Sequence, residues 1–207
     1  MNLSFKEFLE FKRTFKYDYL NTNKTDKGIF IGEFMMEDNE ENKFWETDKF
    51  LNMGFNSKNS LSKILSNLYP YEFKFKGKKV ASIESVLQSL KYSNKKLQNE
   101  ILKYSGLNAY HTRGCNTNNF WGQLGYLYWQ GKPIKRDSED YQLFLDELYF
   151  SCAKNILFRT ALLETREKIL LHHIGSENTN ETVLTRFEYE SRLTALREYL
   201  KSKLTKP

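Results

Sequence analysis

One stretch of sequence limits the possible folds more than any other. Between residues 71 and 102 the apolar spacing changes from that of strands to that of a helix. Phe73 and Phe75 share one side of an extended chain, Gly77 marks a turn, and Val80 resumes the extended path. This pattern predicts a small β-hairpin, so the chain combines strands with helices, as an α+β fold does.

An amphipathic helix is expected directly after the hairpin, with Ser82 as its N-cap. Polar residues near Ser93 and Asn94 predict a break, after which the helical pattern continues until Gly106, a residue type that commonly ends helices. The apolar positions that follow Ser82 recur at the i, i+3, i+4 and i+7 spacing of one helix face: Ile83, Val86, Leu87 and Leu90.

The remaining pattern is mainly helical. Capping boxes at Ser4 with Glu7, and at Thr185 with Glu188, predict helices over residues 4–16 and from residue 185 onward. Two further helices are expected over 138–158 and 159–171, the second ended by Gly175. The inward face of the 138–158 helix should carry Leu145, Leu148, Tyr149, Cys152 and Ile156.

These elements predict a single, predominantly helical α+β domain with a minor sheet. Residues 17–60 look irregular, with one strand near 27–36 and an acidic loop near 37–43. We therefore expect residues 1–60 to form an N-terminal helix and an irregular arm packed on a core domain that covers residues 61–204.

Composition narrows the classes of function. The 207 residues carry a formal net charge of +6, with Lys and Arg interleaved among Asp and Glu. The densest basic stretch, at 74–80, fits either a solvated surface or contact with a phosphate-rich ligand. Since no apolar run is long enough to cross a membrane and the N-terminus lacks the apolar core of a signal peptide, we expect a cytoplasmic protein, in the host cytoplasm if the source is viral.

Cysteine and histidine spacing argues against a metal centre. Cys115 and Cys152 form no CxxC unit, and neither has metal-type spacing to His111, His172 or His173. We expect two reduced thiols, no metal and no cofactor.

The candidate chemistry lies on the helix that follows the hairpin. With Glu84 at angle zero, Gln88 lies at about +40° and Lys91 at about −20° on a helical wheel, along one border of the apolar face. The first-turn position of Glu84 also favours its ionised form. This stripe is either an ordinary solvated border or the edge of a site, and spacing alone leaves both interpretations open. Trp121 and Trp129, in the aromatic segment 106–136, are likewise either core residues or ligand platforms.

Residues 65–92, LSNLYPYEFKFKGKKVASIESVLQSLKY, resemble the first conserved block of the NADAR (YbiA-like) superfamily. Segments 152–172 and 176–200 are similar to later blocks, so the resemblance covers about residues 60–200. Ser85 and Val86 depart from the family's His-aromatic pair, and Arg113-Gly114 reverses a family Gly-Arg pair. The positions that match the first block are Leu65, Ser66, Asn67, Tyr69, Pro70, Gly77, Lys78, Ser82, Glu84, Gln88 and Lys91.

The resemblance implies an N-glycosidase that cleaves a ribosyl–nitrogen bond. The expected substrate is an ADP-ribosylated base or a related NAD-derived ligand, with ADP-ribosylated nucleic acid as one macromolecular form. Family members also act on phosphoribosyl intermediates of riboflavin synthesis, and phage genomes carry members.

The resemblance also assigns roles to residues. Glu84 would stabilise positive charge at C1′ and activate water, while Lys91 would either contact phosphate or attack as an amine. Residues expected to bind substrate are Ser66, Asn67, Gln88, Arg113 (diphosphate), Trp121 or Trp129 (stacking on the base), and Glu181 or Glu177 as a second acidic group.

Three other functions compete with this one. A member that binds ADP-ribose or a cyclic NAD derivative without hydrolysis would act as a sponge. A phosphoribosyl-intermediate glycosidase would use the same chemistry on another substrate. A nucleic-acid-binding protein would use the +6 charge and show salt-sensitive affinity.

Overall fold

The computed structural model describes residues 3–16, 23–25, 28–31, 34–37, 49–111 and 120–204. The helices within them are α1 (Phe5–Thr14), α2 (Ser60–Leu65), α3 (Ile83–Ser89), α4 (Lys95–Ile101), α5 (Gly106–His111), α6 (Phe120–Leu124), α7 (Glu139–Cys152), α8 (Ile156–Glu164) and α9 (Arg186–Leu204). The strands are β1 (Asn23–Thr25), β2 (Gly28–Ile31), β3 (Phe34–Glu37), β4 (Phe50–Asn52), β5 (Phe73–Phe75), β6 (Lys78–Val80), β7 (Tyr126–Trp129), β8 (Lys132–Lys135) and β9 (Ile169–Leu171).

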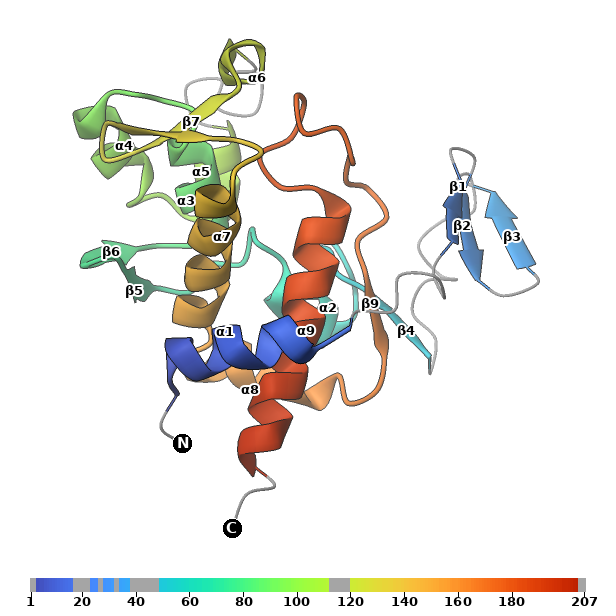
Figure 1. The fold of residues 1–207 in the computed structure, drawn as a ribbon. Coiled ribbons are helices and arrows are strands. Elements are labelled where there is room, and N and C mark those ends of the chain that lie inside the picture. The colour runs from blue at the N-terminus through green and yellow to red at the C-terminus, as the bar shows by residue number, and fades with distance from the viewer. Residues whose placement is uncertain are drawn as a thin grey trace.

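Helices α7 and α9 pack together at the centre of the molecule, and α1 crosses α9 and contacts its C-terminal half (Figure 1). The α1 contact is aromatic, because Phe8 stacks on Phe150 of α7 and meets Tyr199 of α9 edge-on. Helix α3 packs against α4, α5 and α7, and contributes its whole apolar face to the same core. The expected class, a predominantly helical α+β domain, is confirmed.

The predicted hairpin is present as β5 and β6, which pair antiparallel from Phe73 opposite Val80 to Phe75 opposite Lys78. Its two turn residues, Lys76 and Gly77, both have positive φ, at 45° and 76°. That combination is typical of a two-residue type I′ turn, whose twist matches that of the strands. The hairpin delivers the chain directly to Ser82, whose side chain caps α3 by accepting from the Ser85 N–H at 3.0 Å.

The expected helix over 159–171 is wrong in its second half. Helix α8 ends at Glu164, Arg166 adopts a positive φ of 51°, and residues 169–171 form β9, which pairs in parallel with β4. A short apolar run such as 169–171 fits a buried strand as well as a helix, so periodicity alone does not separate the two. Gly175 consequently lies beyond a strand rather than at a helix end.

Two other helix boundaries also differ from expectation. The chain breaks after Cys152, and the Asn155 side chain caps a new helix, so Ile156 is 70% exposed instead of facing the core. Gly106 begins α5 rather than ending α4, and a Cβ there would overlap the backbone of Leu68. Glycine at 106 is therefore explained by close approach of two chain segments, not by helix termination.

Both predicted capping pairs lie at helix N-termini. At α9 the Glu188 N–H donates to Thr185 Oγ1 at 3.1 Å and the Thr185 N–H donates to Glu188 Oε2 at 2.8 Å, which is the full reciprocal pair. At α1 the Ser4 side chain accepts from the Glu7 N–H at 3.4 Å. The Ser4 N–H donates to the Tyr199 hydroxyl, which ties α1 to α9.

The described residues before 60 include strands as well as α1. Strands β1, β2 and β3 form an antiparallel sheet, with β2 and β3 in the segment where one strand was expected. Strand β4 belongs to the sheet that it forms with β9, beside α9. The predicted acidic loop over 37–43 lies, apart from its first residue, outside the described residues. The proposed boundary at residue 60 stays a prediction.

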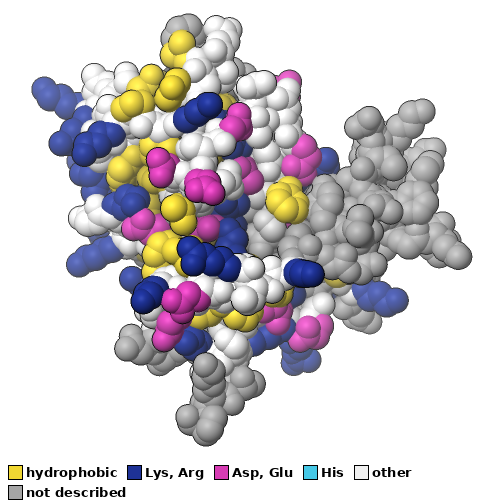
Figure 2. Space-filling view, in the orientation of Figure 1, with side chains coloured by type: hydrophobic (Ala, Val, Ile, Leu, Met, Phe, Trp, Pro, Cys, Tyr) yellow, Lys and Arg dark blue, Asp and Glu magenta, His cyan; other side chains and the backbone are white. Residues whose placement is uncertain are grey.

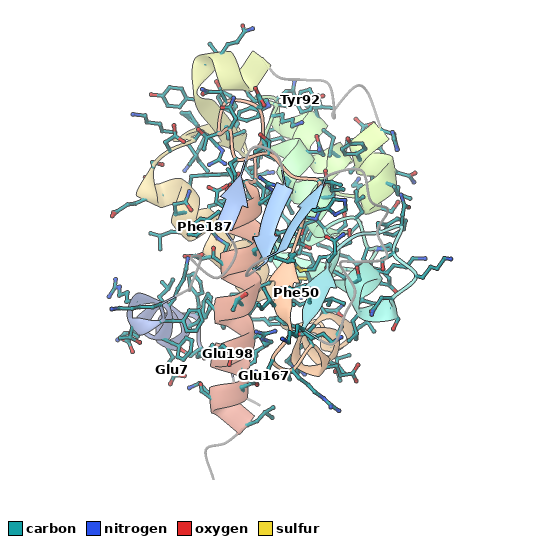
Figure 3. All side chains as sticks on the ribbon, turned by 90° about the vertical axis from the view of Figure 1, so that its right-hand side faces the viewer. Glu7, Phe50, Tyr92, Glu167, Phe187 and Glu198 are labelled. Atoms are coloured by element: carbon teal, nitrogen blue, oxygen red, sulfur yellow. The ribbon has the colours of Figure 1, made fainter. Side chains whose placement is uncertain are left out.

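Surface charges are mixed in sign. Figure 2 shows Lys and Arg side chains scattered over this face with Asp and Glu among them. Near the C-terminal half of α9, Lys201 Nζ contacts Glu167 at 2.6 Å and Glu198 at 3.1 Å, two carboxylates labelled in Figure 3. Within the described part of the chain, no helix has the length and apolar character needed to cross a membrane.

Candidate active site

A pocket of about 510 Å³ opens along α3, from Glu84 in its first turn to Lys91 just beyond its end. Its walls come from α3 and α5, the turns at 54–56 and 66–68, the segment 172–185, and Tyr189 of α9. It brings together six of the nine site residues predicted from sequence: Ser66, Asn67, Glu84, Gln88, Lys91 and Glu181. A larger cavity of about 840 Å³, between Lys49 and the turn at 164–169, contains none of them.

Glu84 is fixed in this pocket by both its backbone and its side chain. The Glu84 N–H donates to the Asn67 carbonyl at 3.0 Å, which attaches the first turn of α3 to the 66–68 turn. One helical turn later, Gln88 Nε2 donates to Glu84 Oε1 at 2.6 Å. The i, i+4 spacing seen in the sequence therefore becomes a direct contact between the two polar side chains.

The environment of Glu84 changes its acidity. Burial raises the pKa of Glu84, while the hydrogen bond from Gln88 and the charge of Lys91 act in the opposite direction. The sequence had indicated a helix-end effect that favours ionisation, but burial is the larger influence. A carboxyl group with a raised pKa accepts a proton more readily than an ordinary glutamate, which suits it to general acid–base catalysis.

Gln88 itself is 4% exposed, and its orientation follows from its partner. Because a carboxylate only accepts, the amide nitrogen must face Glu84, which directs Oε1 the other way. Among the described residues, nothing donates to Gln88 Oε1. A buried acceptor without a donor costs roughly 1–3 kcal/mol, so a ligand that donates a hydrogen bond there recovers that free energy.

Residues from α5 and neighbouring turns form an apolar rim, which we define as Phe55, Leu107, Tyr110 and Ile174. Leu107, Tyr110 and Ile174 are exposed at 38%, 39% and 72%. None of these four residues was predicted from the sequence to belong to the site. Leu107, Tyr110 and His111 share one face of α5 at i, i+3 and i+4, a signal that was obscured because Gly106 was expected to stop a helix.

Glu181 belongs to the segment 175–184, which is attached to the core by Arg136. The Arg136 guanidinium lies over the Tyr141 ring at 4.7 Å and makes two bonds to the Glu188 carboxylate, at 2.9 and 2.7 Å. Its Nε donates to the Thr182 carbonyl at 3.2 Å. Burial acts to raise the pKa of Glu188, but hydrogen bonds and charge from Arg136 bring that pKa below its ordinary value.

The two predicted tryptophans are not brought to the pocket. Trp121, on α6, is 1% exposed, and Trp129 packs edge-on against Phe75 and Phe144 at 5.2 and 5.4 Å between ring centroids. Both tryptophans therefore pack in the core, which is one of the two possibilities that the sequence left open. Arg113 lies outside the described residues.

Histidines and thiols of the described residues form no metal centre. His172 lines the pocket and its Nδ1 contacts the Met53 carbonyl at 2.7 Å, whereas His173 Nδ1 contacts Asn52 Nδ2 at 2.6 Å. Cys152 is a buried free thiol, and burial raises its pKa well above the ordinary value. No group of three or more His, Cys, Asp or Glu side chains in the described ranges could hold a metal ion.

The model of the family described as bacteriophage protein GP30.3 matches residues 59–198, which include the α3 stripe and every other described wall of the pocket from Ser66 to Tyr189. The chain belongs to the GP30.3 family. A relative in Enterobacteria phage T4, described as an uncharacterized 17.1 kDa protein in the Gp30-rIII intergenic region, is 33% identical over 138 residues. That alignment covers 66% of this chain and 90% of the phage T4 protein.

The GP30.3 chain also shares its fold with a solved bacterial protein. The NMR structure of the E. coli protein YbiA matches it with a TM-score of 0.50 and 19% sequence identity, over 80% of this chain and 94% of YbiA. The resemblance to the YbiA-like superfamily is therefore confirmed at the level of fold. At this identity the match carries the architecture and not the substrate.

Proposed function

We propose that this GP30.3-family protein is an N-glycosidase that cleaves a ribosyl–nitrogen bond in an ADP-ribosylated base or a related NAD-derived substrate. The observation that carries the proposal is the Glu84–Gln88 pair, a carboxyl group with a raised pKa beside a buried acceptor in a pocket with an apolar rim. The YbiA-like fold supports the same class of function.

Glu84 is assigned the chemistry at the anomeric carbon. As the C1′–N bond breaks, positive charge builds on C1′ and the ring oxygen, and an ionised carboxylate nearby stabilises it. The incoming water transfers one proton to Glu84 and bonds through its oxygen to C1′. The departing nitrogen keeps the bonding electron pair and takes up a proton from solvent, to which Glu84 returns the proton that it received. Water is the only co-reactant in this hydrolysis.

Gln88 has two roles in this proposal. Its Nε2 group holds one oxygen of Glu84 in place, and its Oε1 accepts a hydrogen bond from a ribose hydroxyl. A ribose with two neighbouring hydroxyl groups would supply that donor, which a phosphate or an apolar ligand would not. The need for a donor to Gln88 Oε1 therefore favours a riboside over other ligands of similar size.

Lys91 lines the pocket just beyond the end of α3 and is near enough to influence the ionisation of Glu84. It serves either as a phosphate contact or as an amine nucleophile that forms a Schiff base with the opened sugar. Reduction with borohydride during turnover separates these roles. A covalent adduct at Lys91 supports the nucleophile, and turnover without any trapped lysine supports the phosphate contact.

The apolar rim replaces the tryptophans as the proposed binding surface for the base. Tyr110 and Phe55 carry flat aromatic faces, and Lys63 Nζ lies 5.4 Å from the centre of the Phe55 ring. Aromatic faces stack on nucleobases of any sequence. This arrangement suits a substrate in which the base is unpaired.

The proposal is tested by incubating the protein with ADP-ribosylated single-stranded DNA and, separately, with ADP-ribosylated protein. Release of free ADP-ribose from DNA, lost in a folded Glu84→Gln variant, is the expected result. Tight binding of ADP-ribose with all ligand intact after long incubation would instead identify a sponge. DNA affinity that depends on salt but not on ADP-ribosylation would identify a nucleic-acid-binding protein.

A further inference from the structure

Two buried tyrosines from the central helices hold the chain where α2 ends and the 66–68 turn, one wall of the pocket, begins. Tyr189 of α9 donates its hydroxyl to the Leu65 carbonyl at 2.6 Å, and Tyr149 of α7 donates to Asn67 Oδ1 at 2.9 Å. Their ring centroids are 5.9 Å apart, and both side chains are 1% exposed. The chain is thus fixed at Leu65 through the backbone and at Asn67 through a side chain.

The Tyr149 bond determines which way the Asn67 amide faces. A hydroxyl that donates to an amide engages its oxygen, so Oδ1 is committed to Tyr149 and the Nδ2 group is left with two N–H donors. Asn67 lines the pocket, and its own carbonyl accepts from the Glu84 N–H. The same residue therefore links Tyr149, deep in the core, to the first turn of the helix that carries Glu84 and Gln88.

We infer that Tyr149 is a positioning residue, which fixes the Asn67 amide so that Nδ2 donates to an oxygen of the ADP-ribosyl group. The inference rests on the proposed function for the identity of the ligand. In this arrangement Asn67 Nδ2 supplies the pocket with a hydrogen-bond donor, and Gln88 Oε1 supplies it with an acceptor. A sugar hydroxyl both donates and accepts, so a donor and an acceptor in one pocket fit a ribose better than either alone.

The Tyr149 hydroxyl must stay protonated to donate a hydrogen bond to Asn67 Oδ1. Burial raises the pKa of Tyr149 well above its ordinary value, with the neighbouring Tyr189 and the charge of Glu84 adding to the effect. The hydroxyl consequently keeps its proton throughout the pH range in which the protein would work.

Tyr149→Phe tests the inference because it removes one oxygen and leaves the ring. The matched control is Tyr199→Phe, on α9, which removes the hydroxyl of an equally buried side chain that donates to the Ser4 carbonyl at 3.0 Å and does not line the pocket. Affinity for ADP-ribose, measured by calorimetry, should fall about 3- to 10-fold in Tyr149→Phe. The control should bind within about 2-fold of the wild-type protein, and equal losses in both variants would overturn the inference.

Asn67→Asp separates positioning from mere packing. The aspartate still accepts from Tyr149 but has no N–H group to offer the ligand. This variant should weaken binding at least as much as Tyr149→Phe, and adding Tyr149→Phe to it should cause less than about 2-fold further loss. Full additivity of the two changes would show that Tyr149 acts independently of Asn67 and would overturn the inference.

A readout without ligand keeps this inference distinct from the proposed function. The side-chain amide signals of Asn67 in a ¹⁵N NMR spectrum should shift in Tyr149→Phe and stay in place in Tyr199→Phe. If the wild-type protein bound no ADP-ribose, the proposed function would fail and the assignment of the ligand with it. An Asn67 signal that is unchanged in Tyr149→Phe would overturn the positioning role alone.

Discussion

Gln88 Nε2 donates a hydrogen bond of 2.6 Å to Oε1 of Glu84, one helical turn earlier on α3. This contact joins two polar residues that the sequence placed on one side of the helix. The Gln88 amide holds the Glu84 carboxyl group in place and acts to lower its pKa. The contact also commits the Gln88 amide to one orientation, which leaves an acceptor for a ligand. The predictions below follow from this pair and from the contacts that build its pocket.

Replacing Gln88 with Met should shift the pH dependence of turnover. The hydrogen bond from Gln88 lowers the pKa of Glu84, so its removal raises that pKa further. If catalysis uses ionised Glu84, the acid limb of the kcat/KM profile moves to higher pH. At neutral pH we expect a loss on the order of 10- to 100-fold. An acid limb that stays in place in Gln88→Met would show that another group controls it.

Glu84→Gln should make the protein more stable at neutral pH. The folded-state pKa of Glu84 is raised, so folding favours its protonated form and opposes ionisation. Its contribution to stability is therefore greatest at acid pH and is lost as pH rises through the folded-state pKa. Urea unfolding should give a gain on the order of 1 kcal/mol for the variant at neutral pH. The gain should shrink toward acid pH, and a pH-independent difference would contradict this account.

Tyr110→Ala should weaken ligands that carry a base. Loss of one stacking face costs roughly 1–3 kcal/mol per base. We therefore expect a higher KM for an ADP-ribosylated base, with a smaller effect on the binding of ribose 5-phosphate, which has no base to stack. Phe187→Ala is the control, since Phe187 is 44% exposed on the first turn of α9 and does not line the pocket (Figure 3). Equal effects of the two variants would exclude a specific role for the rim.

Arg136→Met should destabilise the fold by roughly 3–5 kcal/mol, because it leaves the buried Glu188 carboxylate without its cation. Arg136 holds the pKa of Glu188 low, so the stability that the pair supplies is present at neutral pH and lost as pH falls through that lowered pKa. Lys79→Met is the control, because Lys79 and Glu72 form a pair whose side chains are 70% and 61% exposed. The free energy of unfolding of Lys79→Met, measured by chemical denaturation, should differ from that of the wild-type protein by less than about 1 kcal/mol.

The sequence was most informative where structure depends on local spacing. The hairpin, the capping of α3 by Ser82, and the alignment of Glu84 with Gln88 all follow from residues within about two helical turns. The full capping box of Thr185 and Glu188 was predictable for the same reason.

Features set by distant contacts were not predictable in this way. Trp129 was a candidate platform until its neighbours, Phe75 and Phe144, placed it in the core. The contact of Tyr149 with Asn67 spans 82 residues of sequence, and no periodicity indicates it. Strand β9 was missed because a three-residue apolar run becomes a strand only when β4 is available to pair with it.

The most direct test of the account is single-turnover release of ADP-ribose from ADP-ribosylated single-stranded DNA by the wild-type protein and by Glu84→Gln. Calorimetry with ADP-ribose confirms in parallel that the variant still binds. We predict release by the wild-type protein and a rate at least about 100-fold lower in the variant, with affinity changed by less than about 3-fold. Release at the wild-type rate by folded Glu84→Gln would contradict the assignment of this carboxyl group as the catalytic residue.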